Sequence, residues 1–222
     1  MKILLAIIIT ATFSFGCAML EGEQTTTDSG GGGTTSAPTG GRSTTPTVEP
    51  ESAVTGQRIS AGQNHTCGIK TDGTVKCWGQ NNELGGYHQG SIPADLVTVS
   101  SISAGGYHNC AIKTDGTVKC WGSDSSGQST VPADLGSVST IVAGGAFDGQ
   151  AGNGHTCAIK TDGTVRCWGS DSSGQSTVPA DLGTVSSIGS GGNYTCAIKT
   201  DGRAQCWGAD SYGQSTVPSD FQ

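Results

Sequence analysis

Short runs of alternating apolar and polar residues recur four times along the chain, and in each repeat two such runs flank a Thr-Asp-Gly tripeptide. A period of two is typical of a β-strand with one buried face. In the first repeat the tripeptide is Thr71-Asp72-Gly73, where glycine permits the left-handed conformation that closes a three-residue hairpin loop. The pattern therefore predicts one β-hairpin in each repeat.

The register of this hairpin follows from which side chains share a face. With a three-residue loop, Ile69 faces Val75 and Cys67 faces Cys77, so the apolar residues and both cysteines lie on one side. A two-residue Asp-Gly loop would set Cys67 against Trp78 and mix charged with apolar groups on each face, so we expect the three-residue loop. The same loop gives equivalent pairs in the other repeats: Ile112 with Val118, Ile159 with Val165, and Ile198 with Ala204.

Each hairpin carries two cysteines ten positions apart: Cys67 and Cys77, Cys110 and Cys120, Cys157 and Cys167, Cys196 and Cys206. They fall at non-hydrogen-bonded cross-strand pairs, where α-carbons approach to roughly 4.5 Å, within the disulfide range. Histidines two residues before the first cysteine suggest zinc instead, but the fourth repeat has Tyr194 there, a change that a ligand position should not tolerate. We therefore predict four disulfides, and neither a metal nor a cofactor.

Tryptophan follows the second cysteine in every repeat and so points to the opposite face of the hairpin. There it meets glycine or alanine, as Trp78 meets Gly68, which predicts packing between successive sheets; the alternative is an aromatic binding ladder. Downstream, residues 127–132, 174–179 and 213–218 each run from glycine to proline and are predicted to form a turn and an outer edge strand. Inner strands are predicted where an isoleucine precedes a glycine-rich stretch, at Ile59, Ile102, Ile141 and Ile188.

Repeats of roughly forty residues with several short strands each indicate propeller blades or a solenoid. We expect an all-β fold, a β-propeller-like array of four short blades, each with a disulfide-clipped hairpin. The motif Cys-Ala-Ile-Lys-Thr-Asp-Gly-Thr-Val-Lys-Cys-Trp-Gly, with the Ser-Gly-Gln that follows, resembles the regulator of chromosome condensation repeat family over nearly all of residues 58–222. Within it, Trp-Gly and Gly-Gln-Ser-Thr-Val-Pro-Ala-Asp look most like the bacterial β-lactamase-inhibitory propeller type.

That resemblance implies a β-propeller but leaves the function open, because family members range from chromatin-bound nucleotide exchange factors to secreted inhibitors. Propellers of this family commonly have seven blades, and this chain has four repeats. Four blades could form a small closed ring, an open arc, or half of an assembly completed by a second chain. Because an open arc would expose its terminal faces, we expect self-association.

The first residues predict export. After Met1-Lys2 an apolar run extends from Ile3 to Ile9, too short to span a bilayer, which is typical of a signal peptide over residues 1–16. Cys17 then resembles the acylated cysteine of a bacterial lipoprotein, although Ser14 replaces the usual leucine. It is also the one cysteine left over from the hairpin pairs. Residues 17–57 would be a flexible Thr/Ser/Gly/Pro linker before the folded domain at 58–222.

The net charge of −7 and the scarcity of clustered Lys and Arg argue against binding nucleic acid or anionic lipid through charge. No constellation typical of catalysis stands out, so we expect a non-enzymatic protein. Two insertions between repeats offer aromatic and polar groups on loops, which are either recognition sites or neutral variation in loop length. The candidate binding residues are Glu83, Tyr87 and His88 in the first insertion and Phe147, Asp148 and Gln150 in the second.

These features together favour a binding module, secreted or tethered by lipid to the outer membrane or cell surface, that recognises a protein or glycan through its loops. The alternatives are a structural envelope protein and an inhibitor of a secreted enzyme such as a β-lactamase. Apart from a lipid anchor, no contact with a membrane is expected, and a homo-oligomer is possible for an open array.

Overall fold

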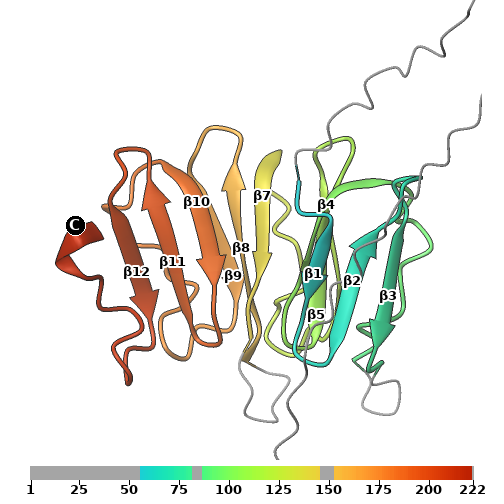
Figure 1. Cartoon of the computed structure of the whole chain (residues 1–222), viewed down its shortest axis with the longest axis horizontal. Coiled ribbons are helices and arrows are strands. Elements are labelled where there is room, and N and C mark those ends of the chain that lie inside the picture. The colour runs from blue at the N-terminus through green and yellow to red at the C-terminus, as the bar shows by residue number, and fades with distance from the viewer. Residues whose placement is uncertain (1–55, 82–86, 146–152, 222) are drawn as a thin grey trace, which may run out of the picture. The chain divides into compact units, whose positions relative to one another are not determined.

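The protein is represented by a computed structural model that describes residues 56–81, 87–145 and 153–221. These residues form four three-stranded antiparallel sheets, one for each repeat, which we call blades 1 to 4 (Figure 1). In every blade the strands follow one another in chain order from inner to outer. The blades comprise β1 (Ile59–Ala61), β2 (His65–Ile69) and β3 (Val75–Gly79); β4 (Val99–Ala104), β5 (His108–Lys113) and β6 (Val118–Gly122); β7 (Val138–Ala143), β8 (His155–Lys160) and β9 (Val165–Gly169); and β10 (Val185–Ser190), β11 (Tyr194–Lys199) and β12 (Ala204–Gly208).

The hairpins have the predicted register. In blade 1, Cys67 pairs with Cys77 and Ile69 with Val75, and the Lys70 amide donates a 2.8 Å hydrogen bond to the Thr74 carbonyl. Gly73 closes the loop with φ of 81°, a conformation that favours glycine. The other three blades repeat this pairing, including Ile198 with Ala204. The three-residue loop is thus confirmed in all four hairpins.

All four predicted disulfides are present, each within one hairpin. The α-carbons of the paired cysteines are 4.0 or 4.1 Å apart, as expected for non-hydrogen-bonded cross-strand neighbours. Each bridge fixes the alignment of its two strands. In blades 1 to 3, the first cysteine of the bridge also belongs to the apolar core shared with the following blade.

Tryptophan fills the space between blades, as predicted. Trp121 of blade 2 packs against Cys67, Ile69 and Val75 of blade 1, together with Leu96 from the connecting segment. Trp168 of blade 3 packs against the equivalent residues of blade 2, and Trp207 of blade 4 packs against those of blade 3. The core of the protein is therefore a series of three similar interfaces, each burying the indole side of one blade against the disulfide side of the blade before it.

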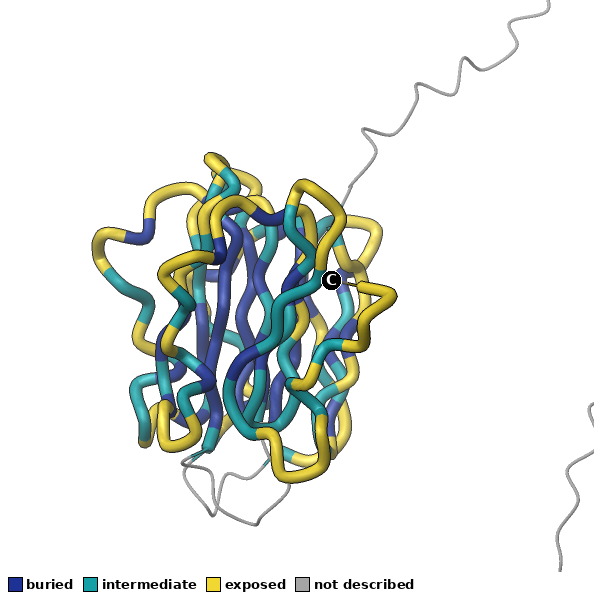
Figure 2. The backbone as a smooth tube through the Cα atoms, turned by 90° about the vertical axis from the view of Figure 1, so that its left-hand side faces the viewer, coloured by how far each residue is buried: buried dark blue, intermediate teal, exposed yellow. Residues whose placement is uncertain are grey.

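The four blades form an open arc. Figure 1 shows β3 and β12 at opposite ends of the array, and Figure 2 shows buried residues concentrated along the strands between exposed loops. Among the described residues no blade precedes blade 1, and its Trp78 is 49% exposed, whereas Trp121 is 7% exposed. A closed four-blade ring would bury both tryptophans equally, so this alternative is wrong for the described residues.

One predicted element is absent. Residues 127–132, 174–179 and 213–218 are loops, not outer strands. In the first, the Asp124 carboxylate accepts hydrogen bonds from the amides of Ser129 (2.7 Å) and Thr130 (3.0 Å) and from the Thr130 hydroxyl (2.6 Å). Because a side chain satisfies these backbone donors, the segment needs no neighbouring strand. The inner strands, by contrast, are confirmed: Ile59, Ile102, Ile141 and Ile188 lie in β1, β4, β7 and β10.

The predicted signal peptide, Cys17 and most of the linker lie outside the described residues. Among the residues that the structure describes, no helix is long and apolar enough to cross a membrane. A short 3-10 helix, η2 (Ser219–Phe221), follows the last blade.

Candidate interaction face

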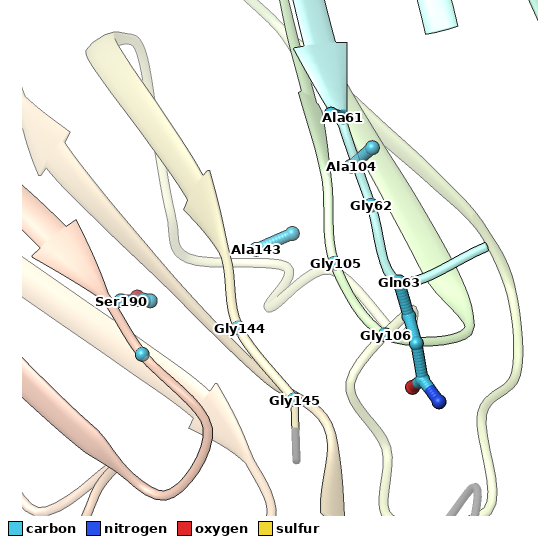
Figure 3. A pocket seen from close by; sticks show the side chains of 11 residues that line it. Ala61, Gly62, Gln63, Ala104, Gly105, Gly106, Ala143, Gly144, Gly145 and Ser190 are labelled. Atoms are coloured by element: carbon cyan, nitrogen blue, oxygen red, sulfur yellow. The ribbon is translucent and has the colours of Figure 1, made fainter. Parts of the chain in front are cut away.

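The inner strands of all four blades end at the same side of the arc, which we call the groove face. Their last residues and the turns that follow line a groove of about 210 Å³. Figure 3 shows these segments lying side by side, with Gln63 the one long side chain among alanine, serine and glycine. These small residues let neighbouring blades approach closely: the Gln63 backbone amide donates a hydrogen bond of 3.2 Å to the Gly105 carbonyl, and the Gly145 amide donates one of 3.1 Å to the Gly191 carbonyl. The lining segments are 61–63, 104–106, 143–145 and 190–191.

Aromatic side chains lie beside this groove. The ring centroids of Tyr87 and Tyr107 are 5.1 Å apart and the ring planes are inclined at 46°, a separation at which aromatic side chains are in contact. The Gln63 side-chain amide donates a hydrogen bond of 3.4 Å to the Tyr107 hydroxyl and thereby joins the pair to the groove. His88 follows Tyr87, is exposed, and has φ of 48°. The first inserted loop therefore contributes to the groove face through Tyr87.

The structure places two of the six predicted binding residues, Tyr87 and His88. Glu83, Phe147, Asp148 and Gln150 lie outside the described residues. Sequence reasoning missed Tyr107 and Gln63, although a comparison of the repeats could have found them. Tyr107 stands where the other repeats have asparagine or glycine, and it is the one aromatic residue at this turn position.

Behind the groove, the histidines of blades 1 to 3 link each blade to the next. His65 Nε2 lies 2.7 Å from Asn109 Oδ1, and in the next two interfaces His108 and His155 lie 2.9 Å from the hydroxyls of Thr156 and Thr195. These polar groups are buried, and each bond crosses between blades. The histidines therefore fasten the stacked blades beneath the groove face.

The same network reaches tryptophan through a buried glutamine. The Gln128 carbonyl accepts hydrogen bonds from the Thr156 hydroxyl (2.9 Å) and from the indole nitrogen of Trp168 (3.0 Å). Gln89 and Gln175 serve the neighbouring interfaces in the same way. The same unit thus recurs at each interface. It consists of a histidine, the asparagine or threonine that precedes the next blade's first cysteine, a glutamine carbonyl and a tryptophan indole. Buried polar groups of this kind cost free energy when they are left unpaired.

Burial keeps these imidazoles neutral. Loss of solvation lowers the pKa of His108 to about 3 and that of His155 to about 4, and it also lowers the pKa of His65. The neighbouring histidines add to the effect at His108, since a second positive charge there would be repelled. Among the described residues, no group of three His, Cys, Asp or Glu side chains could hold a metal ion.

These lowered pKa values predict that the protein loses stability in mild acid. The unfolded chain binds protons on histidine below about pH 6.5, whereas the folded protein does not until the pH approaches 4 or 3, so stability is full above pH 6.5 and falls below it. Between pH 7.5 and 5.5 we expect a loss of about 1.4 kcal/mol for each of His108 and His155.

Urea unfolding across this range measures that loss. Aspartates such as Asp72, whose pKa hydrogen bonds from Thr74 lower to about 2, titrate below the window and do not obscure the slope. An unchanged free energy of unfolding between pH 7.5 and 5.5 would show that the imidazoles are not buried in a neutral form.

The fold and this face together define a class: β-propeller-type repeat proteins, in which a rigid stack of sheets presents loops and strand ends at one side. Four segments match the model of the regulator of chromosome condensation (RCC1) repeat, namely residues 57–85, 99–128, 149–175 and 185–214. Together they cover just over half of the chain. The protein belongs to the RCC1 repeat family.

Solved structures of propellers are similar to this chain. The CRINKLY WD40 ectodomain of the Arabidopsis thaliana receptor kinase ACR4 is 28% identical, with a TM-score of 0.51, over 68% of this chain and 48% of that one. The ectodomain of the Physcomitrella patens receptor kinase CR4 is also 28% identical, with a TM-score of 0.52, over 72% and 42%. Yeast RCC1 (Prp20), solved with Kap60, is 16% identical, with a TM-score of 0.55, over 68% and 43%, which supports the fold alone.

The chain thus spans about half or less of the length of these structures. A comparison with curated protein sequences finds no match.

Proposed function

We propose that the protein is a non-enzymatic binding module that recognises another protein through the groove face. The observation that carries this proposal is the Tyr87–Tyr107 pair, held by Gln63 at the rim of the glycine-rich groove. Tyrosine provides a large contact area with little conformational entropy to lose, and it is enriched where proteins bind one another.

Protein recognition also agrees with what a relative does, since yeast RCC1 binds Kap60 in its crystal structure. Here the net charge of −7 makes a nucleic-acid ligand unfavourable. A glycan is the second ligand class that tyrosines beside a groove can serve. The binding experiment below separates the two, because a protein partner is identified directly by its peptides.

We place this module outside the cytoplasm. Four disulfides in one small domain persist in an oxidising compartment and are rare in a reducing one. The apolar start of the sequence fits a signal peptide over residues 1–16, and acylation of Cys17 would tether the domain to the outer membrane or cell surface through the linker at 17–57. Mass spectrometry of the N-terminal peptide from the native protein tests both processing steps.

A more specific form of this proposal is that the partner is a secreted enzyme, such as a β-lactamase, which the protein inhibits. The Trp-Gly and Gly-Gln-Ser-Thr-Val-Pro-Ala-Asp sequences resemble those of the β-lactamase-inhibitory propeller type. Adding the purified protein to a panel of β-lactamases tests this directly. Inhibition that disappears in the Tyr87→Ala/Tyr107→Ala variant would support it, and undiminished hydrolysis across the panel would exclude it for those enzymes.

The general proposal is tested by comparing captured partners. The full protein, the Tyr87→Ala/Tyr107→Ala variant and a Lys70→Ala control are immobilised and exposed to extracellular and envelope proteins of the producing cells. Lys70 is exposed beside a hairpin loop, at the other end of its strand from the groove face. We expect partners whose recovery falls at least about tenfold with the double variant, the loss of two interface anchors, and stays unchanged with the control. Equal recovery from all three, with circular dichroism unchanged, would contradict the proposal.

A further inference from the structure

The two ends of the arc expose apolar side chains that are buried everywhere else in the array. At the first end face, on blade 1, Ile59 is 61% exposed and Trp78 is 49% exposed. The matching residue to Ile59 in blade 2 is Ile102, which is fully buried against blade 1. The first end face is therefore the indole side of an inter-blade interface without its partner.

The last end face, on blade 4, is the other half of that interface. Phe221 occupies the position of Leu182 in the preceding blade, and it is 55% exposed where Leu182 is 2% exposed. Cys196 is half-buried, whereas Cys157, its counterpart, is fully buried under blade 4. A disulfide flanked by a large apolar side chain is what each internal tryptophan packs against.

The polar contacts are complementary as well. In the last internal interface the Trp207 indole donates to the Gln175 carbonyl at 3.0 Å. The corresponding groups at the two ends are the Trp78 indole on the first end face and the Gln214 carbonyl on the last. Gln214 occupies the same sequence position after blade 4 as Gln175 does after blade 3. Blade 4 departs from the others where a following blade would touch it, with Tyr194 in place of histidine and Phe221 in place of leucine.

We propose that two copies of this chain join head to tail, with the first end face of each on the last end face of the other, and close eight blades into one ring. The chain already builds this interface three times internally, so the proposed contact continues it. Interfaces between unlike faces close into rings when the rotation permits, and rings of about four to eight blades are known for propellers. The polar composition of residues 21–57 makes that segment a poor alternative cover for Trp78.

The test is the mass of the full 222-residue protein as a function of concentration, by light scattering and native mass spectrometry. We expect twice the chain mass at micromolar concentration. Trp78→Asp and Phe221→Asp should each raise the dimer dissociation constant by about a hundredfold or more, since each removes a central apolar anchor from both contacts. Tyr212→Ser is the matched control, because Tyr212 is 95% exposed and replaces the exposed Ser173 of blade 3.

A mixture of the two aspartate variants adds a sharper readout. The Trp78→Asp variant keeps an intact last end face, and the Phe221→Asp variant keeps an intact first end face. The two variants together should therefore form a heterodimer through one head-to-tail contact, whereas neither variant should dimerise alone. A single-chain mass for the wild-type protein at all concentrations would overturn the proposal. So would a dimer that survives either aspartate variant, or growth into larger oligomers, which would mean that the contact does not close.

Discussion

Reduction of the four disulfides is expected to unfold the blades. Each bridge closes a loop of ten residues and stabilises the folded state by roughly 2 to 3 kcal/mol, mainly by restricting the unfolded chain. Four bridges then contribute about 10 kcal/mol, which is comparable to the whole net stability of an ordinary domain, about 5–15 kcal/mol. The short strands and the many glycines of this chain leave little apolar burial to compensate.

The order of reduction should follow burial. Cys67, Cys110 and Cys157 are completely buried, whereas Cys196 is half-buried at the last end face of the single chain, so in dilute solution the Cys196–Cys206 bridge should react first. Thermal unfolding by circular dichroism with and without reductant, combined with alkylation and mass spectrometry, measures both effects. A melting temperature that does not change after complete reduction would show that the hairpins do not depend on their bridges.

The Trp168→Ala variant is expected to lose about 3–5 kcal/mol of stability. This indole is buried among Cys110, Ile112 and Leu135 of the preceding repeat, and it donates a hydrogen bond to the Gln128 carbonyl. Removing it leaves a cavity between two blades and a buried carbonyl with one donor fewer, and neither blade can collapse into the space without breaking its own ladder.

The matched control is Trp78→Ala, the same substitution at the same position of blade 1. Because Trp78 is half exposed and has no preceding blade in the single chain, we expect a loss of under about 1 kcal/mol in dilute solution. Urea unfolding of both variants gives the comparison. Equal losses from the two variants would mean that the indoles are not packing elements between blades.

The hairpins could be predicted because their information is local. The alternation around Thr71-Asp72-Gly73 and the position of each cysteine allow only one register that separates apolar from charged faces. Asp124 shows where local reasoning fails. Val131 and Pro132 look like the end of an edge strand, but the Asp124 carboxylate binds the amides that such a strand would pair.

The groove face was harder to foresee because its contacts join residues far apart in the chain. Tyr87 was a candidate from loop length, yet its partner Tyr107 lies in the next blade and becomes its neighbour only when the blades stack. The histidines show the same limit. Tyr194 in the fourth repeat argues against a zinc site, but the sequence does not show what the histidines do instead. Only the stacked structure shows that His108 forms a hydrogen bond with Thr156 of the following blade. Blade 4 has no such neighbour within the chain.

The central claim is that four blades stack through a repeated interface and leave its two halves open at the ends. Hydrogen exchange of the four indole N–H groups, followed by NMR on the Phe221→Asp variant, tests it most directly. The indole protons of Trp121, Trp168 and Trp207 donate to buried carbonyls and should exchange slowly, whereas that of Trp78 should exchange rapidly. A Trp78 proton as protected as the others would mean that the arc is closed, and rapid exchange at all four would mean that the blades do not stack as described.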